Sequence, residues 1–310
     1  MAFDFGNLTA YTDELSLDLI AKAVLTTDLM NEIDVRSGLS AGTVAINLMD
    51  GELTVNDLDC GWNPAGDVNF SQVDITIADK QVKMELCPDQ LRTYYMSQRM
   101  GASAHAEEVP FEEVIAAYYV ERIKKYNENF LMNGDGTVDG IKAQVLATAG
   151  DTDPVTGEKT GAAIPAGAAA WNVANAIDQA LDLYDAVDES VKDRDDLVMI
   201  VGPANYRTLT RALVAQGETG LFHYKSVEGN EILMLPGTNI KVVKSGGLVN
   251  SDFVVAGPAG FIVAGTGLED DASSISFYFD RGSDIVKFIA KWRLGVSVHQ
   301  LNVFSTNDLA

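Results

Sequence analysis

One amphipathic segment constrains the fold of this chain more than any other feature. Apolar and aromatic residues recur at spacings of four, four, four, three and four and so share one helical face: Phe111, Ile115, Tyr119, Ile123, Tyr126 and Phe130. Pro110 suits the first helical position, because its missing N–H would have no partner there. Gly134 or Gly136 can end the helix in the left-handed conformation. The pattern predicts a helix over 110–132, about 34 Å long at 1.5 Å per residue.

The acidic, glycine-rich stretch NGDGTVDG (133–140) raises the question of a calcium loop. An EF-hand loop that starts at Asn133 must have glycine at its sixth position and glutamate at its twelfth. These positions hold Val138 and Gln144. We therefore interpret the stretch as a helix cap followed by a turn, and we predict no metal.

The first 79 residues have few local partners for their apolar side chains. LSLDLIAKAVL (15–25) predicts a short helix with Leu15 and Leu19 on one side, and no nearby apolar segment can pack against it. Two alternating runs, TVAINL and VDITI, predict strands joined by a long irregular connection that includes Trp62 and Phe70. Connections of that length are uncommon inside compact domains and are usually functional. We expect an arm followed by a protruding hairpin.

The rest of the chain alternates between helices and strands. Residues 80–95 predict a strand and a short helix. One face of a second helix is predicted by Val173, Ile177, Leu181, Tyr184, Val187 and Val191. Strands are predicted at 195–201, 239–245, 252–256 and 260–265, and two or three long strands within 275–304. This order predicts an α+β fold in which one domain interrupts another.

Charge limits the functions that this chain can have. Among 310 residues, 45 are Asp or Glu and 22 are Lys or Arg, which gives a net charge of −23. Residues 41–79 hold seven acidic residues and no lysine or arginine. Sequence-independent DNA binding requires clustered basic residues, so we expect no tight DNA binding. No basic signal sequence and no membrane-spanning apolar run is predicted, and synthesis in the cytoplasm is expected.

The residues that usually carry catalysis are scattered. Cys60 and Cys87 form no CxxC pair and are interpreted as buried thiols of a reducing compartment. His105, His223 and His299 lack metal-ligand spacing. The single Gly-Pro in VMIVGPANYRTL is a weak phosphate cradle and more often a structural turn. We predict no cofactor and no active site.

Taken together, the order of elements resembles that of the tailed-bacteriophage major capsid proteins, which have the Hong Kong 97-type fold. Three stretches carry the resemblance: FLMNGDGTVDGI, DLVMIVGPANYRTLTRAL and FDRGSDIVKFIAKWRLGVSVHQLNVF. The resemblance implies an N-terminal arm, an extended β-hairpin loop, a peripheral domain with a long spine helix, and an inserted axial domain. The implied bounds are arm 1–40, extended loop 41–79, peripheral domain 80–150 and 266–310, and axial domain 151–265.

The resemblance also implies a function. Copies of the chain would form hexamers and pentamers, and these would build an icosahedral head that encloses double-stranded DNA without binding it specifically. Expected partners are further copies, scaffolding, portal and decoration proteins, and the expected location is the virion. Candidate subunit contacts are Leu15, Leu19, Trp62, Phe70, Arg122 and Lys125. The best-known member links a lysine of its extended loop to a neighbour, but residues 41–79 contain no lysine.

Three other interpretations stay open. An encapsulin-like cellular compartment shares the fold and would copurify with a cargo enzyme. A cytoplasmic α+β enzyme with an unrecognised acidic site would remain a small oligomer and bind a saturable ligand. Adhesin and tail-tube subunits are a further class, although they tend to lack a helix as long as 110–132.

Overall fold

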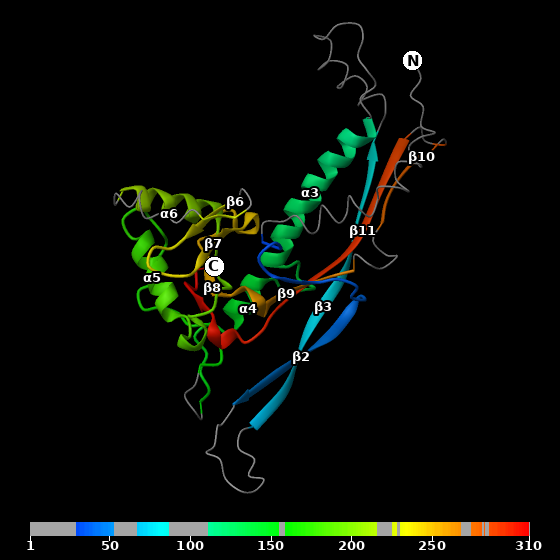
Figure 1. Ribbon diagram of the computed structural model, residues 1–310. Helices are drawn as coiled ribbons and strands as arrows, with labels where there is room; N and C mark the ends of the chain where they lie inside the picture. Colours follow the sequence, from blue (N-terminus) through cyan, green and yellow to red (C-terminus); the bar gives the residue numbers. More distant parts are fainter. Residues whose placement is uncertain are drawn as a thin grey trace.

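The computed structural model describes residues 29–52, 67–86, 111–154, 159–215, 225–227, 230–267, 274–280, 282 and 285–309 (Figure 1). Two six-stranded sheets organise these residues. The helix α3 (Phe111–Asn133) lies between them in the view of Figure 1. The predicted arm helix at 15–25 and the helix expected within 87–95 lie outside the described residues.

The first sheet is built around one very long strand. Its order is β1-β9-β11-β3-β2, and β10 pairs with β11 beside this path. The strands are β1 (Asp34–Arg36), β2 (Gly42–Glu52), β3 (Asp67–Leu86), β9 (Ile262–Thr266), β10 (Ser274–Asp280) and β11 (Ile285–Val298). All pairs are antiparallel except β1 with β9. With 20 residues, β3 pairs with β2 along its first half and with β11 along its second.

The long helix packs on one face of this sheet. The structure confirms the predicted helix to within one residue at each end. Of the predicted apolar face, Tyr119, Ile123 and Phe130 are buried, whereas Tyr126 is 42% exposed. The short helix α4 (Ile141–Ala147) follows the glycine-rich turn and packs against α3 and β11.

The second sheet has the order β12-β8-β4-β7-β6-β5. Its strands are β4 (Leu197–Val201), β5 (Lys225–Val227), β6 (Asn230–Met234), β7 (Lys241–Lys244), β8 (Val254–Pro258) and β12 (Ser305–Thr306). Every residue of β4 is buried, as its continuous apolar sequence predicts. The helix α5 (Ala176–Ala186) packs against β8 and β12, and α6 (Pro203–Ala215) packs against β7 and α5. Single 3₁₀ turns lie at Glu189–Val191, Gly246–Leu248, Ala259–Phe261 and Leu301–Val303.

The C-terminal end of α3 joins the two sheets. The side-chain amide of Asn133 donates a hydrogen bond of 2.7 Å to the carbonyl oxygen of Gly247, in the 3₁₀ turn that follows β7. A Cβ atom on Gly247 would lie 2.3 Å from the carbonyl oxygen of Glu128. Glycine is therefore required where this turn meets the helix.

Three details of the sequence-based fold are corrected. Strand β9 lies within residues 151–265, which were assigned to the inserted axial domain, but it pairs in the first sheet. Strand β12 lies within residues 266–310, which were assigned to the peripheral domain, but it pairs in the second sheet. The two sheets therefore do not divide at residue 265. Phe70 lies inside β3 and not in an irregular connection, because the hairpin pairing continues to Glu52 and Asp67.

The predicted second helix is shorter than expected, and its predicted face is confirmed only in part: Ile177, Leu181 and Tyr184 pack against the core, and Val187 and Val191 are buried just beyond the helix. The helix spans Ala176–Ala186, and its buried residues are Ala176, Ala180 and Leu183. Val173 precedes it and is 48% exposed. Alanine has no side chain beyond Cβ, so it lets a helix approach its neighbours closely, and a periodicity of large apolar residues does not detect such a face.

Candidate subunit-contact site

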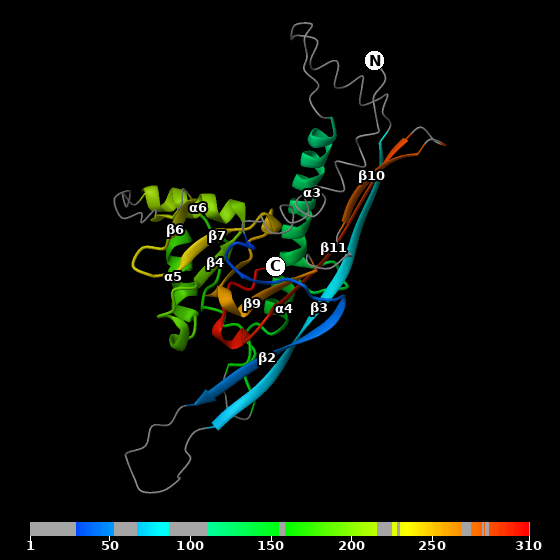
Figure 2. The same ribbon diagram turned by 45° about the vertical axis from the view of Figure 1, so that its right-hand side comes forward.

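The ribbon formed by β2 and β3 projects beyond the other strands of the first sheet and away from the second sheet in Figure 2. Its register runs from Gly42 opposite Ile77 to Glu52 opposite Asp67. A small apolar cluster secures the base of the ribbon: Ile46, Ile75, Ile77 and Val263 are buried, with Leu39 and Val44 packed against them. Within the described residues, β2 pairs with β3 alone and forms an edge of the sheet. Edge strands present unpaired backbone groups that can meet another chain.

A groove of about 310 Å³ lies between α3 and the first sheet. Tyr119 stacks on Phe288 with ring centroids 4.6 Å apart, and Tyr126 meets Trp292 edge-on at 6.2 Å. Arg122 lines the same groove and is exposed. The groove is lined by Lys80, Gln81, Val82, Met84, Tyr119, Arg122, Ile123, Tyr126, Phe288 and Trp292. It is thus largely apolar, with two basic residues in its lining.

The turn after α3 shows what the acidic glycine-rich stretch does. Asp135 Oδ1 accepts hydrogen bonds from the backbone N–H groups of Thr137 and Val138, each over 3.1 Å. The Asp135 carboxylate also contacts the ammonium group of Lys80 on β3. The hydrogen bond from Lys80 lowers the pKa of Asp135, and the bonds from Val138 and Thr137 add to this effect. Asp135 therefore holds the turn and ties it to the sheet.

The structure contains two of the six predicted contact residues with their side chains described. Arg122 lies in the groove, and Lys125 is exposed and pairs with Glu121 one turn earlier, over 2.8 Å. The hydrogen bond that Lys125 donates to Glu121, together with the positive charge of the Lys125 ammonium group, lowers the pKa of Glu121. Phe70 lies opposite Met49 in the ribbon. Leu15, Leu19 and Trp62 lie outside the described residues. The role of all six residues in contacts between subunits stays a prediction.

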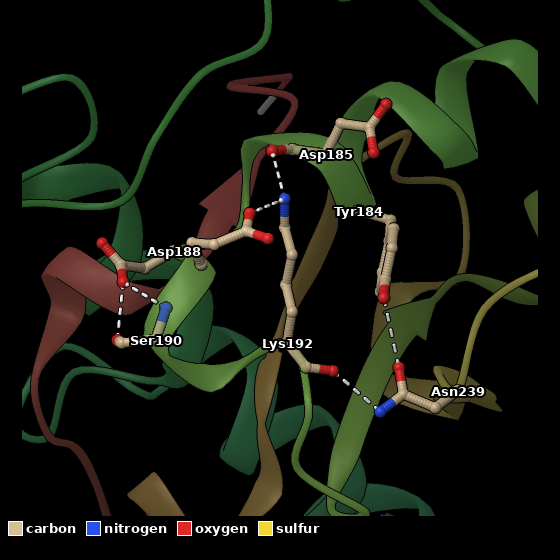
Figure 3. Close-up of polar contacts among 7 residues, drawn as sticks. Tyr184, Asp185, Asp188, Ser190, Lys192 and Asn239 are labelled. Carbon is tan, nitrogen blue, oxygen red and sulfur yellow. Dashed lines mark hydrogen bonds and ion pairs between the residues drawn. The ribbon is translucent and has the colours of Figure 1, made fainter.

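Several hydrogen bonds form a polar network in the second sheet's half of the molecule (Figure 3). Lys192 Nζ donates to Glu189 Oε2 over 2.7 Å and to the carbonyl oxygen of Asp185 over 3.2 Å. Asn239 donates to the carbonyl oxygen of Lys192 over 2.8 Å and accepts from the Tyr184 hydroxyl over 3.3 Å. These bonds connect the end of α5 to the segment before β7. We interpret the network as structural.

Asp188 caps the 3₁₀ turn Glu189–Val191 beside this network. Its carboxylate accepts from the backbone N–H and the hydroxyl of Ser190, over 2.9 and 2.6 Å. These two hydrogen bonds lower the pKa of Asp188. Across the described parts of the chain, no three His, Cys, Asp or Glu side chains cluster as a metal site, and no helix is long and apolar enough to cross a bilayer.

Two features of the fold were not predicted from the sequence. His299 is 2% exposed, and neither ring nitrogen has a hydrogen-bond partner among the described residues. Lysines on β3 and β11 lie on the sheet face opposite α3: Lys83, Lys287 and Lys291. The alternation of lysine with apolar residues in KQVKMEL and DIVKFIAKWRL was a signal for the second feature. The isolated position of His299 in the sequence gave no signal for the first.

Comparison with known proteins gives different results for sequence and for structure. No protein-family model and no curated protein matches this sequence. The fold is similar to solved shell structures. The capsid of an empty GTA particle has a TM-score of 0.56 at 12% identity, and the match covers 91% of this chain and 89% of that one.

Two further structures give a similar result. A virus-like particle from Pyrococcus furiosus has a TM-score of 0.55 at 12% identity, over 96% of this chain and 98% of that one. The satellite phage P4 procapsid that includes the size determination (Sid) protein has a TM-score of 0.52 at 11% identity, over 93% and 97%. These matches confirm the predicted fold class: the chain has the α+β, Hong Kong 97-type fold of phage capsid subunits.

Proposed function

We propose that this chain is the major capsid protein of a tailed phage. Copies of it self-assemble into hexamers and pentamers, which form the icosahedral head around double-stranded DNA. The observation that carries this proposal is the fold likeness to capsid subunits along nearly the whole chain, 91% for the GTA capsid. A likeness that extends over both sheets supports a complete shell subunit more strongly than a shared single domain would.

The β2–β3 ribbon supports the same function. It extends from the body with an edge strand, and it is joined to the body by a small apolar cluster (Figure 2). Such a projection gains little in an isolated subunit, but it can bury surface against a neighbour in a symmetric assembly.

The charge of the chain suits enclosure of DNA. With 45 acidic residues against 22 basic ones, an inner wall of such subunits would not hold the genome by counterion release. The DNA is then contained and not bound. In this proposal the subunit has no catalytic role, needs no cofactor, is made in the host cytoplasm and ends in the virion.

The proposed parts of the subunit follow the implied division. Residues 1–40 are proposed as the arm, except that Leu29, Met30 and Ile33 are buried in the core and β1 pairs with β9 in the first sheet. Residues 41–79 are the extended loop, while 80–150 and 266–310 form the peripheral domain around α3. Residues 151–265 form the axial domain, except that β9 pairs in the first sheet. Scaffolding, portal and decoration proteins are the proposed partners, since a closed head needs a defined size and one DNA entrance.

A second candidate is a shell that encloses something other than a phage genome. The likeness to the virus-like particle from Pyrococcus furiosus, over 98% of that chain, favours this alternative. An encapsulin-like compartment would copurify with a cargo enzyme, whereas a phage head would be accompanied by phage genes and DNA.

Negative-stain electron microscopy of the purified protein tests the proposal. We expect rings or closed shells, formed alone or after coexpression with a scaffold, and light scattering that corresponds to these sizes. A stable monomer under all conditions, scaffold included, contradicts a shell function of either kind. A shell that carries a protein cargo and no DNA in its native source favours the compartment.

A further inference from the structure

Two segments of the chain cross side by side between the two sheets. The first crossover, 259–261, leads from β8 to β9, and the second crossover, 299–304, leads from β11 to β12 (Figure 1). The backbone N–H of His299 in the second crossover donates a hydrogen bond of 2.8 Å to the carbonyl oxygen of Phe261 in the first. We propose that His299 is a pH-sensitive switch: protonation of its ring opens the second crossover and weakens the connection between the two sheets. The switch belongs to the single subunit and does not depend on the proposed function.

The ring of His299 is buried without a hydrogen bond. It is 2% exposed, and neither Nδ1 nor Nε2 has a partner in the parts of the chain that the structure describes. A neutral imidazole has one N–H donor and one acceptor nitrogen, and a buried polar group without a partner costs free energy. A protonated ring would bury a second unpaired donor and a full charge as well. Water can satisfy all of these groups once the crossover opens.

Two charged residues on β1 act on His299 electrostatically. Arg36 disfavours the protonated ring and Asp34 favours it, and Arg36 Nε lies 3.2 Å from Asp34 Oδ2. Because the two charges are paired, their effects on the ring partly cancel. Burial has the largest effect, and it lowers the pKa of His299. The ring therefore binds a proton more weakly in the closed crossover than it does in water.

The first crossover is held by the second sheet's half of the molecule. The backbone N–H of Ala259 donates to the carbonyl oxygen of Asp196 over 2.8 Å. The Asp196 carboxylate pairs with Arg194 over 2.7 Å, and the Arg194 guanidinium lies over the ring of Phe261, 5.0 Å from its centroid. On α4, which packs against β11, the charged residue is Lys142, which cannot neutralise an imidazolium. These groups fix the first crossover and give no compensation to a proton on the second.

The second crossover is the segment that can open. Gln300 has φ 47° and ψ 58°, a left-handed conformation that a residue other than glycine adopts at a cost. Gln300 and Asn302 are exposed, and the turn Leu301–Val303 is a 3₁₀ helix, whose hydrogen bonds have poorer geometry than those of an α-helix. Beyond the turn, the buried Phe304 ring lies 2.2 Å from where a Cβ on Gly257 would be. Opening of the turn thus relieves strain and hydrates the imidazole, while Phe304 keeps its place against β8.

The size of the effect follows from the difference in proton binding between the two forms. In the open, hydrated crossover the imidazole titrates near about 6.5. As the pH falls below this value, the open form takes up a proton that the closed form does not, until the lower pKa of the closed form is reached. From about pH 7.5 to about pH 5.5, the equilibrium constant for opening should rise roughly tenfold. At higher pH both forms are neutral, and His299 does not affect the opening.

Hydrogen exchange followed by mass spectrometry tests the switch in the full-length protein. The measured quantity is the exchange rate of a peptide that covers 298–304, divided by that of a peptide from α6, which contains no acidic residue and no histidine. The division removes the pH dependence that all amides share. We expect this ratio to rise roughly tenfold from about pH 7.5 to about pH 5.5 in the wild type. In His299→Phe, which keeps a buried aromatic ring, the ratio should stay constant.

Gln300→Gly is a matched variant that changes the strain and keeps the histidine. Glycine adopts the left-handed conformation without the steric cost, so the crossover should open roughly threefold less often, or rarer still, at each pH. The rise between the two pH values should equal that of the wild type. This variant and the wild type together test the switch even if His299→Phe does not fold.

Two outcomes overturn the inference. The first is a ratio in the wild type that is constant between the two pH values, since His299 would then act only on the unfolding of the whole subunit. The second is an equally large rise in His299→Phe, since another group would then be responsible. Neither outcome depends on whether the protein forms shells, so a failure of the switch is distinguishable from a failure of the proposed function.

Discussion

The indole Nε1 of Trp292 donates a hydrogen bond of 3.0 Å to Asn127 Oδ1, in the buried space between β11 and α3. The two residues are 165 positions apart in the sequence. Trp292 is 3% exposed and Asn127 is fully buried. This buried polar bond therefore ties the long helix to β11 at a defined position, beside aromatic contacts such as Tyr119 with Phe288.

Loss of this bond should destabilise the subunit. Trp292→Phe keeps an aromatic ring but leaves Asn127 Oδ1 without its donor, and an unsatisfied buried acceptor costs about 1–3 kcal/mol. Trp292→Ala adds a cavity and should cost about 3–5 kcal/mol. Urea unfolding of the unassembled subunit measures both. Equal stability of Trp292→Phe and wild type would mean that the bond contributes nothing to the packing of α3.

The glycine-rich turn after α3 offers a matched pair of variants. Gly134 and Gly136 both have positive φ, 72° and 83°. A Cβ on Gly134 would lie 2.2 Å from the carbonyl oxygen of Val138, whereas nothing lies within 4 Å of a Cβ on Gly136. Gly136→Ala should cost about 1–2 kcal/mol from backbone strain alone, and Gly134→Ala clearly more. Similar losses in thermal unfolding for the two would contradict the close approach seen at Gly134.

His299 should make stability depend on pH. Burial lowers the pKa of His299; Arg36 lowers it further, and Asp34 partly opposes the shift. In the unfolded chain a histidine titrates near about 6.5. Above that pH both states are neutral and His299 has no effect. As the pH falls below it, the unfolded chain takes up the proton first, so stability is lost until the lower pKa of the folded state is reached.

The variant His299→Phe isolates this effect from the titration of the many carboxylates. The free energy of unfolding of wild type and variant is measured between pH 7.5 and the acidic limit of solubility. We expect the wild type to lose stability relative to the variant as the pH falls. Two parallel curves would show that His299 does not titrate differently in the folded state.

Trp62 is predicted to be an intersubunit anchor. It lies in the sequence between the end of β2 and the start of β3, outside the described residues. Burial of a tryptophan removes roughly 150–250 Å² from water, which contributes about 4–6 kcal/mol before ordering costs. Trp62→Ala should leave the circular dichroism of the subunit near that of the wild type and sharply reduce shell yield. The neighbouring Asn63→Ala serves as a control, and an unaltered yield in Trp62→Ala refutes the anchor role.

The elements that were predicted correctly are those whose local signals agree. The long helix has an apolar face, a proline at its start and glycines at its end, and each signal is read within a few residues. The five apolar residues of β4 and the alternating runs of β2 and β3 are equally local. The helix face at 173–191 was predicted only in part, because the most deeply buried positions of α5 include Ala176 and Ala180, which a search for large apolar residues overlooks.

The candidate contact site was predicted only in part, since most of its features depend on which strands pair. The sequence alone determined the helix of 110–132, the strands of the hairpin, the absence of lysine in residues 41–79 and the excess of acidic residues. Only the tertiary structure decided that β9 joins the first sheet and that the hairpin pairing extends to Glu52 and Asp67. It also brought Lys83 beside Lys287 and Lys291, and it buried His299 near Asp34 and Arg36. The physical reason is that propensity, capping and periodicity act over a few residues, whereas strand pairing joins residues more than 200 positions apart, such as Arg293 and Asp79, whose side chains pair over 2.8 Å.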